Sequence, residues 1–201
     1  MRTIVITGGT GDLGSVVVPR LAREYRCHVV TRGASDAAKV KTSDNVTTVE
    51  GLDGVRKLGP VYALVHLVGG FTMSSERDDF LRMFDTNVMP FVDTLDATTL
   101  EDGGRVVAVS AAISLTRPAS LKAYVMTKSA LNALVEMTAQ ELKPRGITVN
   151  AVLPGTMNTP GNLGSAKPEQ LVPTVRVAET IAVLLSDQAA AITGQLVAIT
   201  V

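Results

Sequence analysis

The chain has 201 residues, 46% of them apolar, and its 19 basic and 19 acidic side chains give a formal net charge of zero. This length suits one domain over residues 1–201, and the balanced charge excludes the basic surface that nucleic acid or an anionic membrane attracts. The single cysteine, Cys27, excludes an internal disulfide and, without a secretory leader or a long apolar run, predicts a cytoplasmic protein.

Short apolar segments alternate with helix-like patterns along the whole chain. Strands are predicted at 2–7, 27–31, 45–50, 61–68, 105–110, 147–153 and 195–201. Helices are predicted at 13–24, 76–100, 121–142 and 175–185, while 32–44 has room for a helical stub at most and 51–60 is a short connection. Because the strands are runs of Val, Ile and Leu, we expect a Rossmann-type doubly wound parallel sheet in a three-layer α/β/α domain.

The first predicted loop is rich in glycine, and Gly9, Gly11 and Gly14 in it satisfy the pattern G-x-G-x-x-G. Glycine lets the backbone approach a pyrophosphate, and the following helix offers free N–H groups and the positive end of its dipole. The position after the first strand indicates dinucleotide binding, although a tight turn that needs small residues only for packing is the alternative. The expected contacts are Gly8, Thr10, Gly11, Asp12, Leu13 and Gly14.

Arg32 ends the second predicted strand, about twenty residues past the glycines, where such folds read the adenosine ribose. An acid there binds the hydroxyls of an unmodified ribose, whereas an arginine suits a 2′-phosphate. The nearest acid, Asp36, comes four residues later. The sequence therefore favours NADP over NAD as the cofactor, with a solvated surface arginine as the alternative.

Tyr124 and Lys128 lie four residues apart on the predicted helix 121–142, and therefore on one face of it. A cation near a phenol favours phenolate and lowers the pKa from its ordinary value of ~10. The pair is thus a candidate general acid with its own electrostatic tuner. The alternative is an ordinary solvated pair.

With these motifs in this order, the chain resembles the short-chain dehydrogenase/reductases over essentially its whole length. The matching pieces are TGGTGDLG, Asn87 in FDTNVMPF, VVAVS, Tyr124-x-x-x-Lys128 and VNAVLPGTMNT. The resemblance implies that Tyr124 is the acid/base, that Lys128 holds the nicotinamide ribose, and that Asn87 helps to carry a proton relay. It also implies cofactor contacts from Val68, Gly69, Gly70, Pro154, Gly155, Thr156 and Thr159.

The chain departs from the family pattern at the catalytic serine. That serine usually lies thirteen residues before the tyrosine, where this chain has Ala111. Ser110 and Ser114 flank the position, and Ser110 is taken as the catalytic candidate. At the end of the fourth strand the chain reads His66-Leu67-Val68-Gly69-Gly70, which differs from the usual Asn-Asn-Ala-Gly. His66 is expected to be a core histidine.

The quinonoid dihydropteridine reductase branch of that family shows similar departures. It too lacks the serine, and its Gly-Gly-aromatic sequence is matched by Gly69-Gly70-Phe71. The resemblance implies a small carbonyl or a quinonoid or imine acceptor, with Phe71 stacked on it or buried in the core. The loop 155–173 is expected to be mobile and to cover the cofactor in part through Met157, Leu163 and Leu171. That branch has an acid where this chain has Arg32.

We expect a small-molecule substrate and neither a metal, nucleic acid nor a membrane as partner. The predicted helices 76–100 and 121–142 carry more apolar residues than one buried face requires, and in the family such helices pair between subunits, so a homodimer or homotetramer is expected. The competing interpretation is a non-catalytic NADP(H)-binding sensor or regulator. Ala111 favours it, whereas the intact set of Tyr124, Lys128 and Asn87 disfavours it.

Overall fold

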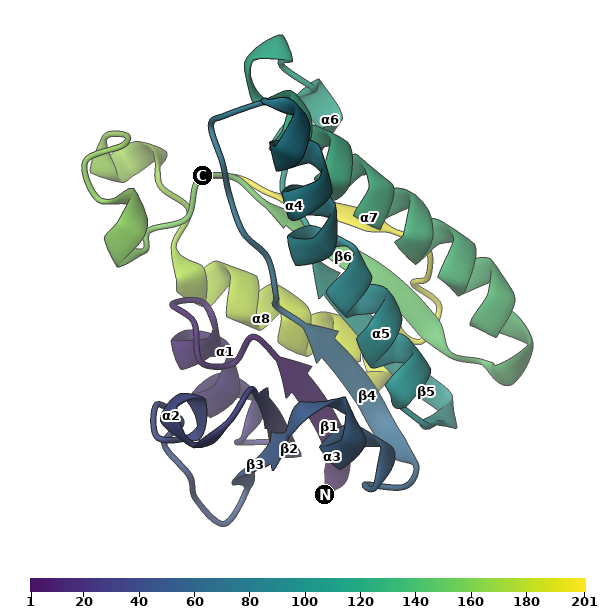
Figure 1. The fold of residues 1–201 in the computed structure, drawn as a ribbon. Helices are drawn as coiled ribbons and strands as arrows, with labels where there is room; N and C mark the ends of the chain where they lie inside the picture. The colour runs from purple at the N-terminus through teal and green to yellow at the C-terminus, as the bar shows by residue number, and fades with distance from the viewer.

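Seven parallel strands form one sheet in the order β3-β2-β1-β4-β5-β6-β7 in the computed structural model, which describes residues 1–201 (Figure 1). The strands are β1 (Arg2–Thr7), β2 (Tyr25–Thr31), β3 (Val46–Glu50), β4 (Val61–His66), β5 (Leu100–Val109), β6 (Thr148–Pro154) and β7 (Leu196–Ile199). The strand order reverses between β1 and β4, so a crevice is expected beyond the carboxyl ends of those strands. The Rossmann-type sheet is confirmed.

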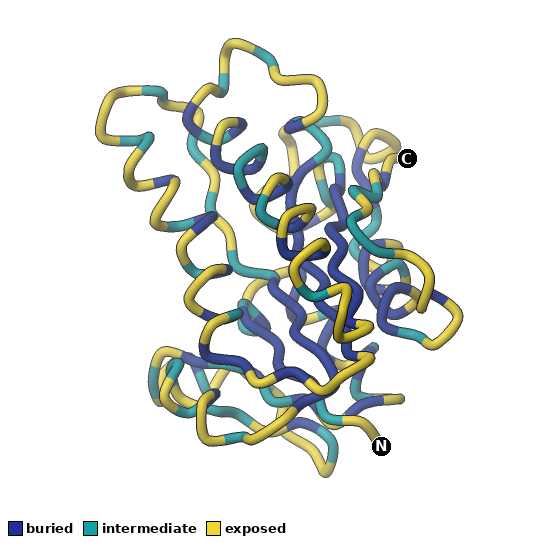
Figure 2. Tube along the Cα trace, turned by 90° about the vertical axis from the view of Figure 1, so that its right-hand side faces the viewer, coloured by how far each residue is buried: buried dark blue, intermediate teal, exposed yellow.

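Both faces of the sheet are buried because neighbouring side chains on each strand are apolar. In β1, Ile4 and Ile6 enter one core cluster, whereas Val5 enters the cluster on the opposite face. Successive strand residues point to opposite faces, so such a run requires cover on both sides. Figure 2 shows the buried strands inside an exposed rim of loops and outer helix turns.

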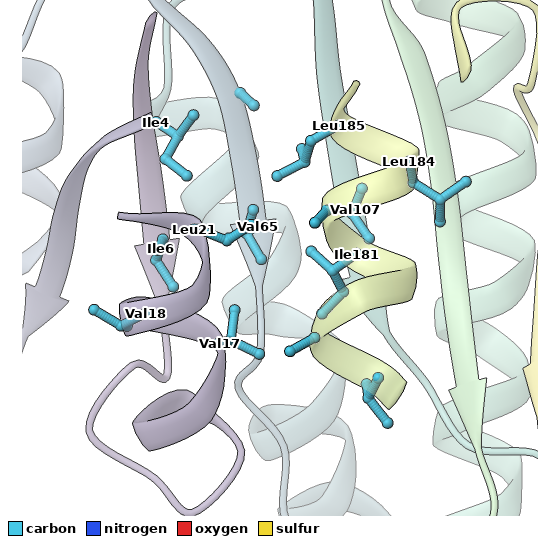
Figure 3. Close-up of a cluster of buried hydrophobic side chains, with 14 of the residues drawn as sticks. Ile4, Ile6, Val17, Val18, Leu21, Val65, Val107, Ile181, Leu184 and Leu185 are labelled. Atoms are coloured by element: carbon cyan, nitrogen blue, oxygen red, sulfur yellow. The ribbon is translucent and has the colours of Figure 1, made fainter. Parts of the chain in front are cut away.

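The helices α1 (Gly14–Leu21) and α8 (Thr174–Leu185) cover one face of the sheet and pack against each other. Figure 3 shows Leu21 and Ile181 among the strand residues of this cluster. Full burial of such a side chain contributes ~1.5–3 kcal/mol. The second face is covered mainly by α3 (Gly51–Arg56), α5 (Met89–Ala97) and α7 (Lys122–Leu142).

The predicted single helix 76–100 is wrong, because the structure has two helices there. α4 (Arg77–Asn87) ends and α5 (Met89–Ala97) begins at Val88, whose φ of −114° departs from helical geometry. Pro90 comes two residues later, and its ring lacks an N–H and crowds the preceding turn. The last part of the predicted helix, Leu100, instead opens β5 by pairing with Val61.

The connections carry more structure than predicted. α2 (Ala34–Ala37) is the expected stub, whereas α3 and α6 (Ile113–Thr116) are not predicted. The loop 155–173 is fastened at its base, because the Val172 N–H donates to Thr156 O at 2.8 Å and the Asn158 N–H to Val172 O at 2.8 Å. None of the helices is both long and apolar enough to span a membrane.

Candidate active site

A cleft of about 880 Å³ lies at the carboxyl edge of the sheet, where the loops after β1, β4, β5 and β6 meet. This is where ligands bind in open parallel sheets. The predicted site residues that line it are Gly8, Gly11, Asp12, Leu13, Gly14, Gly69, Gly70, Phe71, Ser110, Tyr124, Lys128, Pro154, Gly155, Thr156, Met157 and Thr159. Four others, Thr10, Arg32, Val68 and Asn87, do not line it.

The glycine-rich turn is shaped by close backbone contacts. Gly8 has a φ of +70°, and a Cβ there would lie 2.8 Å from both the Leu67 carbonyl carbon and the Val68 nitrogen. A Cβ at Gly14 would collide with the backbone of Gly9. The turn leads straight into α1, so the free N–H groups at its start border the cleft. These features fit a dinucleotide pyrophosphate, which needs close backbone approach and N–H donors.

Tyr124 lies in the first turn of α7 and lines the cleft. Its ring meets Phe71 edge to face, with 5.0 Å between the ring centroids, so Phe71 packs on Tyr124 while leaving 58% of its surface exposed. Burial raises the pKa of Tyr124 to about 12. The predicted lowering of this pKa by Lys128 is therefore wrong for this geometry, and the phenol is protonated at neutral pH.

Lys128 lies one turn further along α7, where it lines the same cleft but is only 4% exposed. Its Nζ donates to Val109 O at 3.1 Å, and burial lowers the pKa of Lys128 to about 8. A Cβ at Gly69 would lie 2.9 Å from this Nζ. The absence of a side chain at Gly69 therefore leaves space for the ammonium group of Lys128.

Asn87 is fully buried at the end of α4, behind the wall of the cleft. Its Oδ1 accepts the Gly70 N–H at 2.8 Å, and its Nδ2 donates to Thr127 Oγ1 at 3.1 Å. Asn87 thus fastens the loop after β4 to α7. Its implied part in a proton relay stays a prediction.

The position of the family's serine offers no hydroxyl, because Ala111 lines the cleft there. Ser110 also lines the cleft, with its Oγ donating to Lys128 O at 3.2 Å. Ser114 is fully buried, and its Oγ donates to Ala111 O at 2.7 Å and accepts from Asn132 Nδ2 at 2.8 Å. Ser114 therefore holds the loop against α7 and does not line the cleft.

His66 ends β4 and is a fully buried core residue, as predicted. Its Nδ1 lies 2.9 Å from Thr7 Oγ1, and its ring meets Phe91 edge to face. Burial, and to a smaller extent the charge of Lys128, lowers the pKa of His66 to about 3. The neutral ring links the ends of β1 and β4, which carry two of the loops that form the cleft.

The cleft has further lining residues that the sequence did not single out. They are Leu67, Met73, Val109, Ala112, Ile113, Thr116, Leu121, Asn162 and Ser165. All of them are uncharged. The only feature of the sequence that could have identified them is their position at the carboxyl edge of the sheet or just before α7. The predicted apolar lining by the loop 155–173 is corrected: of its three apolar side chains named above, only Met157 lines the cleft, because Leu171 is buried outside it and Leu163 is exposed to solvent.

The sheet order and the position of the cleft define a Rossmann-type α/β protein with a site at its topological switch point. A family model described as enoyl-(acyl carrier protein) reductase matches residues 3–200. The chain belongs to the short-chain dehydrogenase/reductase family. The narrower likeness to quinonoid dihydropteridine reductase stays a prediction.

Three relatives illustrate the similarity. The cyclic-di-GMP-binding biofilm dispersal mediator protein of Escherichia coli K12 is 29% identical over 80% of this chain and 75% of its own length. A short-chain dehydrogenase/reductase from Serratia marcescens is 26% identical, with a TM-score of 0.86 and coverage of 98% of this chain and 96% of its own. BdcA, solved in complex with NADPH, is 26% identical, with a TM-score of 0.85 and coverage of 98% and 92%.

Proposed function

We propose that the chain is an NADP(H)-dependent oxidoreductase that reduces a small unsaturated acceptor, with Tyr124 as the proton donor. The observation that carries this proposal is the joining of the glycine-rich turn, Tyr124 and Lys128 in one cleft. The solved complex of BdcA with NADPH supports the choice of cofactor, as does Arg32 at the end of β2.

The residues that would hold the cofactor lie along the length of the cleft. The turn from Gly8 to Gly14 would receive the pyrophosphate, and Lys128 would donate to the hydroxyls of the nicotinamide ribose. Pro154 and Gly155, which follow the buried part of β6, would border the nicotinamide ring. Bound there, the cofactor would supply a hydride from C4 of its nicotinamide.

Tyr124 is in the protonation state that reduction of an acceptor requires. With a pKa of about 12, the hydroxyl carries its proton at neutral pH and can donate it to an acceptor atom that receives electrons. In the oxidative direction the phenolate would be needed, and burial disfavours that form. Tyr124 would thus deliver the balancing proton.

The substrate end of the cleft suits an uncharged, flat acceptor. Its walls are formed by Phe71, Met73, Ile113 and Leu121, together with neutral polar side chains. Since Ala111 cannot donate to a carbonyl oxygen, a simple ketone would lose the hydrogen bond that the family's serine supplies beside the Tyr124 hydroxyl. We therefore place quinonoid and imine acceptors, such as a quinonoid dihydropterin, ahead of simple ketones and aldehydes.

A second candidate function is a non-catalytic NADP(H)-binding sensor or regulator. Two observations favour it: Ala111 in the cleft, and the likeness to a relative named as a cyclic-di-GMP-binding mediator protein. Such a protein would bind the cofactor without turning it over.

One experiment separates the two functions. NADPH and NADH binding is titrated by nicotinamide fluorescence, and oxidation of the bound cofactor is then followed with ketones, aldehydes and quinonoid dihydropterins. The enzyme predicts tighter binding of NADPH and turnover that is fastest with the pterin. Binding without oxidation across the panel supports the sensor, and a preference for NADH overturns the cofactor assignment.

A further inference from the structure

Three charged side chains gather just beyond the end of β2, outside the cleft. Asp36 accepts two hydrogen bonds from the Arg32 guanidinium, with Nε–Oδ2 at 2.8 Å and Nη2–Oδ1 at 3.3 Å. It also accepts the Arg32 backbone N–H at 3.4 Å and Lys39 Nζ at 3.1 Å. The carboxylate is therefore held by two cations at once.

The three side chains differ sharply in exposure. The side chain of Asp36 is only 8% exposed, whereas those of Arg32 and Lys39 are 88% and 59% exposed. The hydrogen bonds from Arg32, and next those from Lys39, hold the pKa of Asp36 well below its usual range. The cluster thus has an ionised carboxylate beneath and two cations facing solvent, with one positive charge left over.

The cations keep donors for an external anion. A guanidinium carries five N–H donors and an ammonium three, and Asp36 occupies only two and one of them respectively. The remaining guanidinium edge has the fork geometry that matches a phosphate. A phosphate monoester, which carries up to two negative charges, complements this arrangement.

The cluster lies beside the glycine-rich turn. β2 pairs with β1 in parallel, so both strands end at the same edge of the sheet. A Cβ at Gly9 would lie 2.7 Å from Cγ1 of Val29, which shows how closely the turn packs on β2. In folds of this kind the adenosine ribose of a dinucleotide lies at the end of the second strand.

We propose that Asp36 is a specificity-determining positioning residue that holds Arg32 and Lys39 as a paired cation site for the adenosine 2′-phosphate of NADP(H). The inference rests on the proposed function and deepens it. Because Asp36 is paired with these two cations, it is not free to accept hydrogen bonds from the ribose hydroxyls, which an acid in this region binds in NAD(H). The two cations together outweigh the single charge of the carboxylate, whereas loss of the carboxylate frees a long, flexible guanidinium that must be ordered again on binding.

The test compares adenosine 2′,5′-bisphosphate with adenosine 5′-monophosphate by calorimetry, without any turnover. The wild type is expected to bind the bisphosphate more tightly. Asp36→Asn is expected to lower this preference by about three- to tenfold, the worth of ordering one charged donor set, and to leave binding of the monophosphate unchanged. A merely structural role for Asp36 would weaken both ligands equally. Asp44→Asn, in the exposed turn before β3, removes the same charge and should leave the preference unchanged.

Lys39→Met gives a second measurement at a side chain that is 59% exposed, and it should lower the preference about threefold. An Asp36→Asn preference that is equal to or higher than that of the wild type overturns the inference, because the carboxylate would then be idle or a competitor of the phosphate. A wild type that binds both ligands equally contradicts the NADP(H) assignment itself. The two failures are therefore distinguishable.

Discussion

The two ends of the cleft are built in different ways. At the glycine-rich end the backbone itself fills the space, since a Cβ at Gly8 would meet the backbone of Leu67 and Val68 at 2.8 Å. At the substrate end side chains form the wall, and Phe71 and Met73 are 58% and 76% exposed. A close-packed backbone tolerates no added atom, whereas an exposed side chain can change without disturbing the fold. We therefore expect nucleotide binding and choice of acceptor to be separable in this protein.

The largest expected effect falls on the substrate end, at the Tyr124 hydroxyl. Tyr124→Phe keeps the ring against Phe71 and removes only the proton donor. Turnover should fall by ~10²–10⁴, toward the upper end because Ala111 supplies no second hydroxyl. NADPH affinity, measured by fluorescence, should stay the same. Tyr25→Phe, at the opposite edge of the sheet, is the control and should leave turnover unchanged. Near-normal turnover of Tyr124→Phe would remove the phenol from the chemistry.

A substitution at the glycine-rich end, by contrast, should change the affinity for the cofactor. Gly8→Ala adds a Cβ where the backbone has a φ of +70° and no free space. We expect NADPH affinity to fall by roughly 100-fold and the free energy of unfolding to drop by more than ~1 kcal/mol. Gly161→Ala is the matched control, because a Cβ there meets open space. If both variants bind NADPH as the wild type does, the turn is not the pyrophosphate site.

Lys128 lines the same cleft, and its burial should lower the free energy of unfolding by an amount that depends on pH. Its pKa is lowered from 10.5 to about 8 in the folded chain. Between those values the unfolded chain binds the proton more tightly, so the cost is complete below about pH 8 and disappears as the pH rises toward 10.5. Lys128→Met should therefore raise the free energy of unfolding by about 2 kcal/mol at pH 7. Removing the buried charge stabilises the fold by about 1.4 kcal/mol for each unit by which the pKa is lowered, and losing the hydrogen bond to Val109 O offsets part of that gain.

Urea unfolding at pH 7 and pH 10 measures this change, with Lys122→Met on the exposed side of the same helix as the control. A gain at pH 7 that persists unchanged at pH 10 would mean that the buried charge is not its source. The same variant should weaken NADPH binding, so stability and function should move in opposite directions.

The smallest expected effect is a rise in the rate of ketone reduction, from a change at the substrate end. Ala111→Ser puts a hydroxyl on the wall of the cleft, where the family's serine usually lies. Reduction of a simple ketone should rise about tenfold, because a second donor would then share the developing charge. Ala112→Ser adds a hydroxyl on the neighbouring lining residue and should leave the rate unchanged. Equal rates for both variants would show that position 111 does not face the reacting atoms.

Much of the architecture could be predicted because its signals are local. The strand at 2–7 matches β1, and the stub after β2 is present as α2. The break between α4 and α5 also had a local signal, Pro90, which the prediction of one long helix overlooked. The helix α6, by contrast, has a single turn and no strong pattern. Its place follows from Ser114, which is bound to Asn132 of α7.

The sequence by itself determined the parallel sheet, the glycine-rich turn and the shared face of Tyr124 and Lys128, because the spacing of neighbouring residues encodes all three. Only the tertiary structure decided which polar groups meet: Thr7 with His66, Asn87 with Gly70, and Ser114 with Asn132. It also decided that burial raises the pKa of Tyr124, although a cation lies one helical turn away. Burial and long-range hydrogen bonds depend on how the whole sheet and its helices pack, and no local spacing carries that information.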